Sequence, residues 1–229
     1  MTSPPPSSIE VERKYEAPLG ADALEAAVLR HGGQLIGKVR FVDTYWDSAD
    51  CCLTRGDAWL RRREGEWELK LPLDEEAAYR SGGERTVFRE IEGSAEVARA
   101  LHQHLPERFE TCIQASTPAV DGDVLMKQMM EAAGMAPFAE FETVRLKLEL
   151  KGCSIDLDVA SFGLSIMEVE LMCTHAEQVA EAEERIERVA ALLQARPLDK
   201  AKGGKLETYI RKYCPNVLAN LIDAGILQG

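Results

Sequence analysis

The chain contains 229 residues, of which 45% are hydrophobic and 29% are charged, a composition typical of an ordinary globular protein. Its formal net charge of −12 disfavours broad binding to nucleic acid or to anionic membranes, although a local basic cluster could still hold a small anion. No apolar run approaches the roughly 18 residues needed to span a membrane. The six cysteines have no metal-ligand spacing and indicate reduced thiols, so we expect a cytoplasmic monomer without nucleic-acid or membrane partners.

Residues 1–8 are rich in proline and serine and are predicted to form a disordered tail, which leaves residues 9–229 as one domain. This domain begins with IEVERKY at residues 9–15, where apolar and charged residues alternate as in a β-strand. One face of the strand therefore carries Glu10, Glu12 and Lys14. Taken by itself, the pattern also fits an edge strand whose charges lie in water.

A helix, a strand and a hairpin follow this first strand. Residues 21–30 have helical spacing and end at two glycines, and residues 37–47 are rich in the β-branched and aromatic types found in strands. Residues 57–71 predict a β-hairpin that turns at Glu64-Gly65. One side of its two arms gathers an aromatic residue and the charged residues: Trp59, Arg61, Arg63, Glu66, Glu68 and Lys70. Residues 84–92 predict another strand, whose orientation the sequence leaves open.

The second half of the chain returns to the same pattern. Two helical segments between residues 95 and 133 are expected to cover a sheet. Three stretches between residues 143 and 172 then alternate apolar with charged side chains, as strands with one charged face do. Residues 177–194 predict an amphipathic helix, and two further helices are expected to begin near Lys205 and at Pro215.

The chain thus contains about eight predicted strands, most of them antiparallel, and a charged face recurs in at least five of them. We infer an inside-out α+β fold: a closed antiparallel β-barrel whose charged faces line the interior and whose apolar faces are covered by helices. Burying an ion costs several kcal/mol of folding free energy unless the ion is paired or bound to a ligand. This interior would therefore have to contain water and bind a charged ligand. The alternative is a solvated sheet face on which the charges form ion pairs.

The charged faces hold two classes of side chain. Guanidinium and ammonium groups suit a polyphosphate, and these come from Lys14, Arg61, Arg63, Lys70, Arg145, Lys147 and Lys205. Carboxylates are hard oxygen ligands for Mg²⁺ or Mn²⁺, and these come from Glu10, Glu12, Asp156, Asp158, Glu168 and Glu170. Basic residues alone would bind phosphate, whereas the two classes together indicate metal-assisted phosphoanhydride chemistry.

An ordered set of motifs carries a family resemblance. The set consists of ExExK in IEVERKY, DTYWDS at 43–48, AWLRRREGEWELK at 58–70, IDLD at 155–158, MEVEL at 167–171, and Lys205 followed by Tyr209. It resembles the CYTH family, the triphosphate tunnel metalloenzymes, over residues 9–213. The resemblance implies an eight-stranded antiparallel tunnel that binds a triphosphate with Mg²⁺ and hydrolyses an anhydride bond. Within the family, the chain most closely resembles the animal enzymes that act on thiamine triphosphate.

The resemblance also implies roles for individual residues. Metal ligands are implied at Glu10, Glu12, Asp156, Glu168 and Glu170. Triphosphate ligands are implied at Lys14, Arg61, Arg63, Lys70, Arg145 and Lys205. The basic Lys147 and the acidic Asp158 are second-tier candidates. Tyr45 is expected to pair with Lys70 and help to activate water. Trp59 is expected to form a platform for the cationic thiamine moiety, a contact worth about 0.5 to 2 kcal/mol, although it also fits a packed barrel tryptophan.

The expected activity is therefore hydrolysis of thiamine triphosphate to thiamine diphosphate and phosphate, with Mg²⁺, or Mn²⁺ in its place, as the cofactor. An inorganic tripolyphosphatase of the same fold and a non-catalytic polyphosphate sensor are the alternatives. The chain has no GxxxxGK[ST] or GxGxxG sequence, so nucleotide binding at a helix-start loop is unsupported. His102 and His104 point to different sides of a predicted helix and do not form a metal-binding pair.

Overall fold

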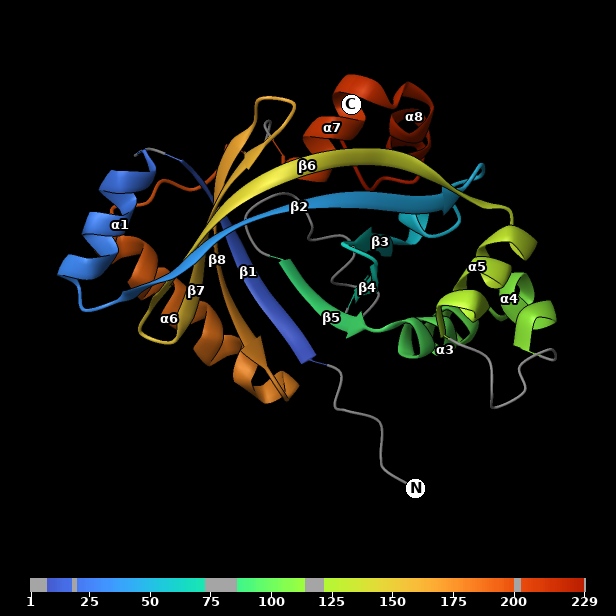
Figure 1. The fold of residues 1–229 in the computed structure, drawn as a ribbon, viewed down its shortest axis with the longest axis horizontal. Helices are drawn as coiled ribbons and strands as arrows, with labels where there is room; N and C mark the ends of the chain where they lie inside the picture. The colour runs from blue at the N-terminus through green and yellow to red at the C-terminus, as the bar shows by residue number, and fades with distance from the viewer. Residues whose placement is uncertain (1–7, 18–19, 73–85, 114–121, 200–202, 229) are drawn as a thin grey trace.

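A closed β-barrel is the centre of the structure. The computed structural model describes residues 8–17, 20–72, 86–113, 122–199 and 203–228. The strands follow the order β1-β5-β4-β3-β2-β6-β7-β8 around the barrel, and neighbours are antiparallel (Figure 1). They are β1 (Ser8–Glu16), β2 (Gln34–Ser48), β3 (Trp59–Arg63), β4 (Glu66–Pro72), β5 (Thr86–Glu92), β6 (Met135–Leu150), β7 (Cys153–Ala160) and β8 (Ser165–Cys173). The predicted eight-stranded antiparallel barrel is confirmed.

Helices lie around the barrel in three groups (Figure 1). One group packs on β1, β2, β6, β7 and β8 and consists of α1 (Ala21–Arg30) and α6 (Val179–Leu192). A second group packs near β4 and β5 and consists of α3 (Ser94–His104), α4 (Pro106–Ile113) and α5 (Gly122–Ala132). The third consists of α7 (Lys205–Tyr213), which contacts β6, and α8 (Pro215–Asp223). Two 3₁₀ turns complete the described elements, η1 (Thr54–Gly56) and η2 (Ala176–Gln178).

Apolar side chains pack between these helices and the outer faces of the strands. Ile155 and Val169 face each other across β7 and β8 and are fully buried, together with Ile186 and Val189 of α6. A second apolar cluster lies between the β3–β4 hairpin and α3–α5 and includes the fully buried Leu69. Because successive residues of a strand point to opposite faces, this packing turns the charged residues towards the interior.

The β3–β4 hairpin shows how a local turn sets the interior. Glu64 and Gly65 both have positive φ angles, 48° and 98°. Two successive positive φ angles are typical of a type I′ turn, whose twist matches that of the flanking strands. The resulting register places Arg61 directly opposite Glu68. Residues directly opposite each other share a face of the sheet, so both side chains point into the barrel.

The structure differs from the sequence predictions in a few elements. The helix α4 was missed, because Pro106 lies only two residues after the end of α3 and the segment resembles a connection. The strand predicted at residues 84–92 begins at Thr86 in the described residues and turns Glu90 towards the interior. The predicted disordered tail lies outside the described residues except for Ser8, where β1 begins. Within the described part of the chain, none of the helices is long and apolar enough to cross a membrane.

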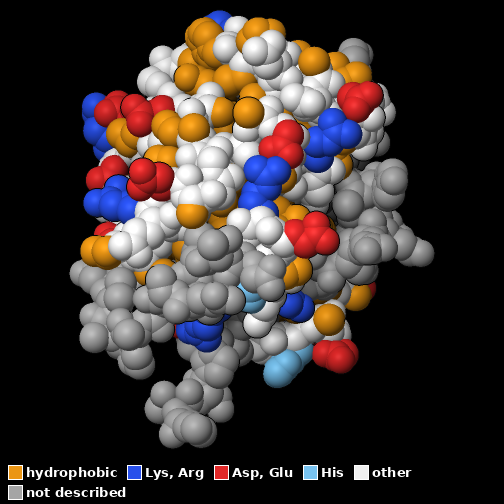
Figure 2. Space-filling model, turned by 90° about the vertical axis from the view of Figure 1, so that its right-hand side faces the viewer, with side chains coloured by type: hydrophobic (Ala, Val, Ile, Leu, Met, Phe, Trp, Pro, Cys, Tyr) orange, Lys and Arg blue, Asp and Glu red, His pale blue; other side chains and the backbone are white. Residues whose placement is uncertain are grey.

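The outer surface on the α3–α5 side has mixed charge. Figure 2 shows this face, where acidic, basic and apolar side chains are interspersed. Ion pairs in this part of the protein include Arg108 with Asp50, at 2.6 Å, and Arg62 with Asp123, at 3.6 Å. Basic residues on this face are thus mixed with acidic ones.

Candidate active site

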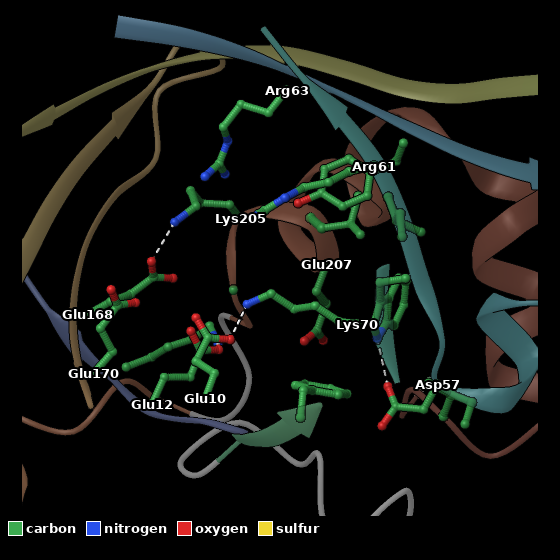
Figure 3. Close-up of a pocket in the computed structure, with 18 of the residues that line it drawn as sticks. Glu10, Glu12, Asp57, Arg61, Arg63, Lys70, Glu168, Glu170, Lys205 and Glu207 are labelled. Carbon is green, nitrogen blue, oxygen red and sulfur yellow. Dashed lines mark hydrogen bonds and ion pairs between the residues drawn. The ribbon is translucent and has the colours of Figure 1, made fainter. Parts of the chain in front are cut away.

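A cavity opens into the interior of the barrel, and the charged faces of its strands line it (Figure 3). It brings together residues as far apart in the chain as Glu10 and Lys205. Asp156 and the second-tier residues Lys147 and Asp158 are not among the residues that line this cavity. The other predicted site residues all line it: Glu10, Glu12, Lys14, Tyr45, Trp59, Arg61, Arg63, Lys70, Arg145, Glu168, Glu170 and Lys205. The recurring charged faces therefore meet in one place, as the barrel interpretation requires.

Three carboxylates gather at one side of the cavity. One carboxylate oxygen from each of Glu10, Glu12 and Glu170 lies within 4.8 Å of the other two. Glu12 and Glu170 face each other across β1 and β8. Burial, together with the charges of Glu10, Asp156 and Glu12, raises the pKa of the Glu170 carboxyl to about 8. A divalent cation would relieve this repulsion, and these hard oxygen donors fit Mg²⁺ or Mn²⁺.

The other two predicted metal ligands, Glu168 and Asp156, lie outside this cluster and are paired with other cations. Glu168 Oε2 is 2.8 Å from Lys205 Nζ and 3.2 Å from Arg145 Nη2. Burial alone would raise the pKa of Glu168, but Lys205, Lys14 and Arg145 lower it well below its ordinary value. Asp156 faces Glu168 across β7 and β8, is fully buried, and has Oδ2 2.5 Å from Arg145 Nη1. Metal ligation by these two carboxylates stays a prediction.

Arg145 and Lys205 form the most enclosed cationic part of the cavity. The guanidinium of Arg145 donates two hydrogen bonds of 2.7 Å to the buried carboxylate of Asp158, which Lys205 also contacts. Lys205 reaches this place from the first residue of α7, directly after Gly204. A Cβ atom at Gly204 would lie 2.9 Å from Cε of Lys14, so the glycine permits the helix start to approach β1 closely. Lys147, of the second tier, faces Asp156 across β6 and β7.

Arg63 is held by two residues that were not predicted as site residues from the sequence. Asp43, which is fully buried on β2, accepts hydrogen bonds from Nε and Nη2 of Arg63 at 2.7 and 3.1 Å. The guanidinium also lies 4.1 Å from the ring centre of Phe41, and that of Arg145 lies 5.3 Å from the same ring. Both Phe41 and Asp43 share the interior face of β2, so strand alternation could have found them once Tyr45 was placed there.

Arg61 and Lys70 lie among further carboxylates. Arg61 contacts Glu68 and has Nη2 3.7 Å from Glu90 Oε1. Lys70 contacts Glu10 across the cavity, as Figure 3 shows, and its Nζ is also 3.7 Å from Glu90. Although burial would lower it, the pKa of Lys70 is raised by Glu10, Glu12 and Glu90. Glu90 was missed because the sequence did not settle which face of its strand points inward.

The family model for the CYTH domain matches residues 8–204. The chain belongs to the CYTH domain family. The human protein named thiamine-triphosphatase is 31% identical over 227 residues, which cover 95% of this chain and 90% of that protein. The Macaca fascicularis protein of the same name is 30% identical with the same coverage. The family resemblance drawn from the ordered motifs is confirmed.

Solved structures share the CYTH barrel at lower identity. A protein from Pyrococcus horikoshii OT3 superposes with a TM-score of 0.56 at 19% identity, covering 89% of this chain and 99% of that one. A Hippeastrum protein, described as a candidate adenylyl cyclase with a dominant triphosphatase activity, gives a TM-score of 0.52 at 15% identity, covering 90% and 96%. At these identities the likeness shows the fold alone.

Tyr45, on β2, lines the cavity of this CYTH barrel. Its ring packs against Phe138 and Phe141, with centres 6.4 and 5.9 Å away. Burial and the charge of Asp43 raise its pKa, so the hydroxyl stays protonated at neutral pH. The predicted pairing of Tyr45 with Lys70 to activate water stays a prediction.

One part of the cavity, around Trp59, is lined mainly by aromatic and apolar side chains. Trp59 lies there, with Leu206 and Ile210 of α7 and with Ile226 and Leu227 from the end of the chain. Trp59 was predicted from the hairpin pattern, and Lys205 from its place at the start of an expected helix. The terminal residues were missed, because helical spacing shows which residues share a face but not where the helix lies.

Proposed function

We propose that this protein is a triphosphatase that hydrolyses thiamine triphosphate to thiamine diphosphate and phosphate, with Mg²⁺, or Mn²⁺, as its cofactor. The observation that carries the proposal is the meeting of two sets of charges in one cavity, the clustered carboxylates of Glu10, Glu12 and Glu170 and a group of lysines and arginines. A triphosphate and a divalent cation together complement both sets. The names of the human and macaque relatives support the thiamine part of the substrate.

The ion pairs across the cavity suggest how both ligands would be accommodated. Lys70 contacts Glu10, and Lys14 contacts Glu12. Once these carboxylates take a metal ion, the two ammonium groups would be free to contact phosphate oxygens instead. A bound metal would neutralise phosphate charge and polarise the phosphoryl group. We therefore expect the triphosphate and the metal to bind with positive cooperativity.

The reaction would rest on positioning and charge rather than on a strong base. Water attacks the terminal phosphorus, the bond from that phosphorus to the bridging oxygen breaks, and thiamine diphosphate leaves with phosphate as the second product. Lys70 and Tyr45 both have raised pKa values and stay protonated, so they would orient the water or the phosphate oxygens by donating hydrogen bonds. Arg61, Arg63, Arg145, Lys14 and Lys205 would hold the phosphate chain.

Trp59 would distinguish thiamine triphosphate from inorganic tripolyphosphate. A thiazolium ring over the indole gains about 0.5 to 2 kcal/mol, whereas the phosphate contacts are common to both substrates. The test is phosphate release from each substrate, with Mg²⁺ and with a chelator present. We expect thiamine triphosphate to have the higher kcat/KM, and Trp59→Ala to lower the ratio of the two values about fivefold.

Other outcomes would select the alternatives. A strong preference for tripolyphosphate, with a ratio that Trp59→Ala leaves untouched, would make the protein an inorganic tripolyphosphatase. Tight binding of thiamine triphosphate without phosphate release would support a sensor. Phosphate release that Glu10→Gln abolishes would eliminate the sensor, because the carboxamide keeps the size of the side chain but not its charge. The expected single domain, monomeric state and cytoplasmic location stay predictions.

A further inference from the structure

Asp57 makes a direct contact with the aromatic platform of the cavity. Its Oδ1 accepts a hydrogen bond of 2.8 Å from Nε1 of Trp59, drawn as a dashed line in Figure 3. Asp57 is only 2% exposed and lines the same cavity. An indole has one N–H group, so this bond determines how the plane of the Trp59 ring lies.

The backbone around Asp57 fixes the position of its carboxylate. Asp57 ends the turn η1 with a φ of 55°, a left-handed conformation that aspartate adopts more readily than most residues. Its N–H donates to the carbonyl of Thr54 at 3.1 Å. The backbone from which this carboxylate extends is thus held in a defined conformation.

The carboxylate of Asp57 lies directly beside the indole of Trp59. Glu207 is a further acidic residue that lines the cavity, and it is paired with Arg211 at 2.7 Å. A carboxylate that accepts the indole N–H increases the electron density of the ring, and a cation on the ring face is then held more strongly. The features at this end therefore suit an organic group that is flat and positively charged.

We propose that Asp57 is a positioning residue that fixes and polarises Trp59, and thereby makes this end of the cavity selective for a cationic heteroaromatic ring. The inference rests on the proposed function and deepens it, because it names the residue through which Trp59 recognises the substrate. Asp57 touches neither the phosphate chain nor the reacting atoms; its effect passes through the indole N–H.

The test compares kcat/KM for thiamine triphosphate and for tripolyphosphate in Asp57 variants. Asp57→Ala is expected to lower the ratio of the two values about fivefold, mainly through a higher KM for thiamine triphosphate, because the ring is remote from the bond that breaks. Asp57→Asn keeps an acceptor oxygen and the backbone preference, so it should lower the ratio only about twofold. Asp22→Asn, an exposed residue of α1, makes the same change in net charge and should leave the ratio as in the wild type.

A second background separates positioning from a general structural role. Trp59→Phe keeps an aromatic face but has no N–H, so adding Asp57→Ala to it should change the ratio by less than about twofold. A fivefold fall in that background would overturn the inference, as would an equal loss of activity towards both substrates in Asp57→Ala. If Trp59→Ala lowers the ratio but Asp57→Ala does not, only this inference fails. If tripolyphosphate is strongly preferred and the ratio does not depend on Trp59, the proposed function and this inference fail together.

Discussion

The two faces of the β7–β8 strand pair are held together by different forces. On the outer face, Ile155 and Val169 lie opposite each other, both without exposed surface, against α6. One residue along each strand, on the inner face, Asp156 and Glu168 lie opposite each other. Like charges directly across a strand pair are destabilising, whereas packed β-branched residues stabilise the sheet. The same two strands therefore gain stability on one face and lose it on the other.

The repulsion between the carboxylates of the inner face is offset by cations that lie between them. Arg145 contacts Asp156, Asp158 and Glu168, and Lys205 contacts Asp158 and Glu168. A buried ion pair adds little net stability over an apolar pair, but removing one partner leaves the other charge uncompensated. The contrast teaches that the interior is organised for a charged ligand, and that the outer face supplies the packing that keeps it assembled.

The largest effect should come from removing the central cation of the inner face. Arg145→Leu leaves the fully buried Asp156 and Asp158 without that partner, and we expect it to lower the free energy of unfolding by about 3 to 5 kcal/mol in urea titrations. Arg188→Leu removes an exposed cation of α6 that pairs with Glu184 and should cost less than about 1 kcal/mol. Equal losses in the two variants would contradict the contrast between the faces.

The sequence predicts this two-faced arrangement well, because alternation along a strand is a local property. Glu10, Glu12 and Lys14 could be assigned to one face from the seven residues of IEVERKY alone. Repetition of the pattern in later strands then indicated a charged interior. The ligand roles came from the family resemblance, which rests on the order of the motifs rather than on any single one.

The sequence could not predict which charged side chains pair with each other inside the barrel, because the pairing depends on the order of the strands. Asp43 and Arg63 meet because β2 is the neighbour of β3, and Glu90 meets Lys70 because β5 is the neighbour of β4. Strand alternation says which face a residue occupies but not which strand lies beside it. The terminal residues near Trp59 were missed for the same reason, since nothing local fixes where α7 and α8 lie.

An intermediate effect is expected from the outer face. Ile155→Ala should lower the free energy of unfolding by about 3 kcal/mol, because it removes buried methyl groups and leaves a cavity beside α6. Below its melting temperature the variant should keep kcat/KM for tripolyphosphate within about twofold of the wild type. Val159→Ala, at a half-exposed position of the same strand, is the matched control and should cost less than about 0.5 kcal/mol. Activity lost together with stability would show that the two faces are not independent.

The smallest effect should have the opposite sign. Glu170 is crowded by Glu10, Glu12 and Asp156, and no ion pair of Glu170 is seen in the described residues. Folding raises the pKa of this carboxyl to about 8, so at neutral pH the carboxyl ionises readily only in the unfolded chain. This difference stabilises the unfolded chain relative to the folded one. Glu170→Gln is therefore expected to raise the free energy of unfolding by about 1 kcal/mol in the presence of a chelator.

The same variant should lose the benefit of the metal. In the wild type, Mg²⁺ with tripolyphosphate is expected to raise the melting temperature, since ligands that bind only the native state stabilise it. In Glu170→Gln this rise should be much smaller, because one of the three clustered carboxylates is gone. Glu149→Gln on the exposed end of β6 is the control and should keep the full rise. A Glu170→Gln protein that is less stable in chelator, or that keeps the full rise, would contradict the view that the interior gives up stability to hold a cation.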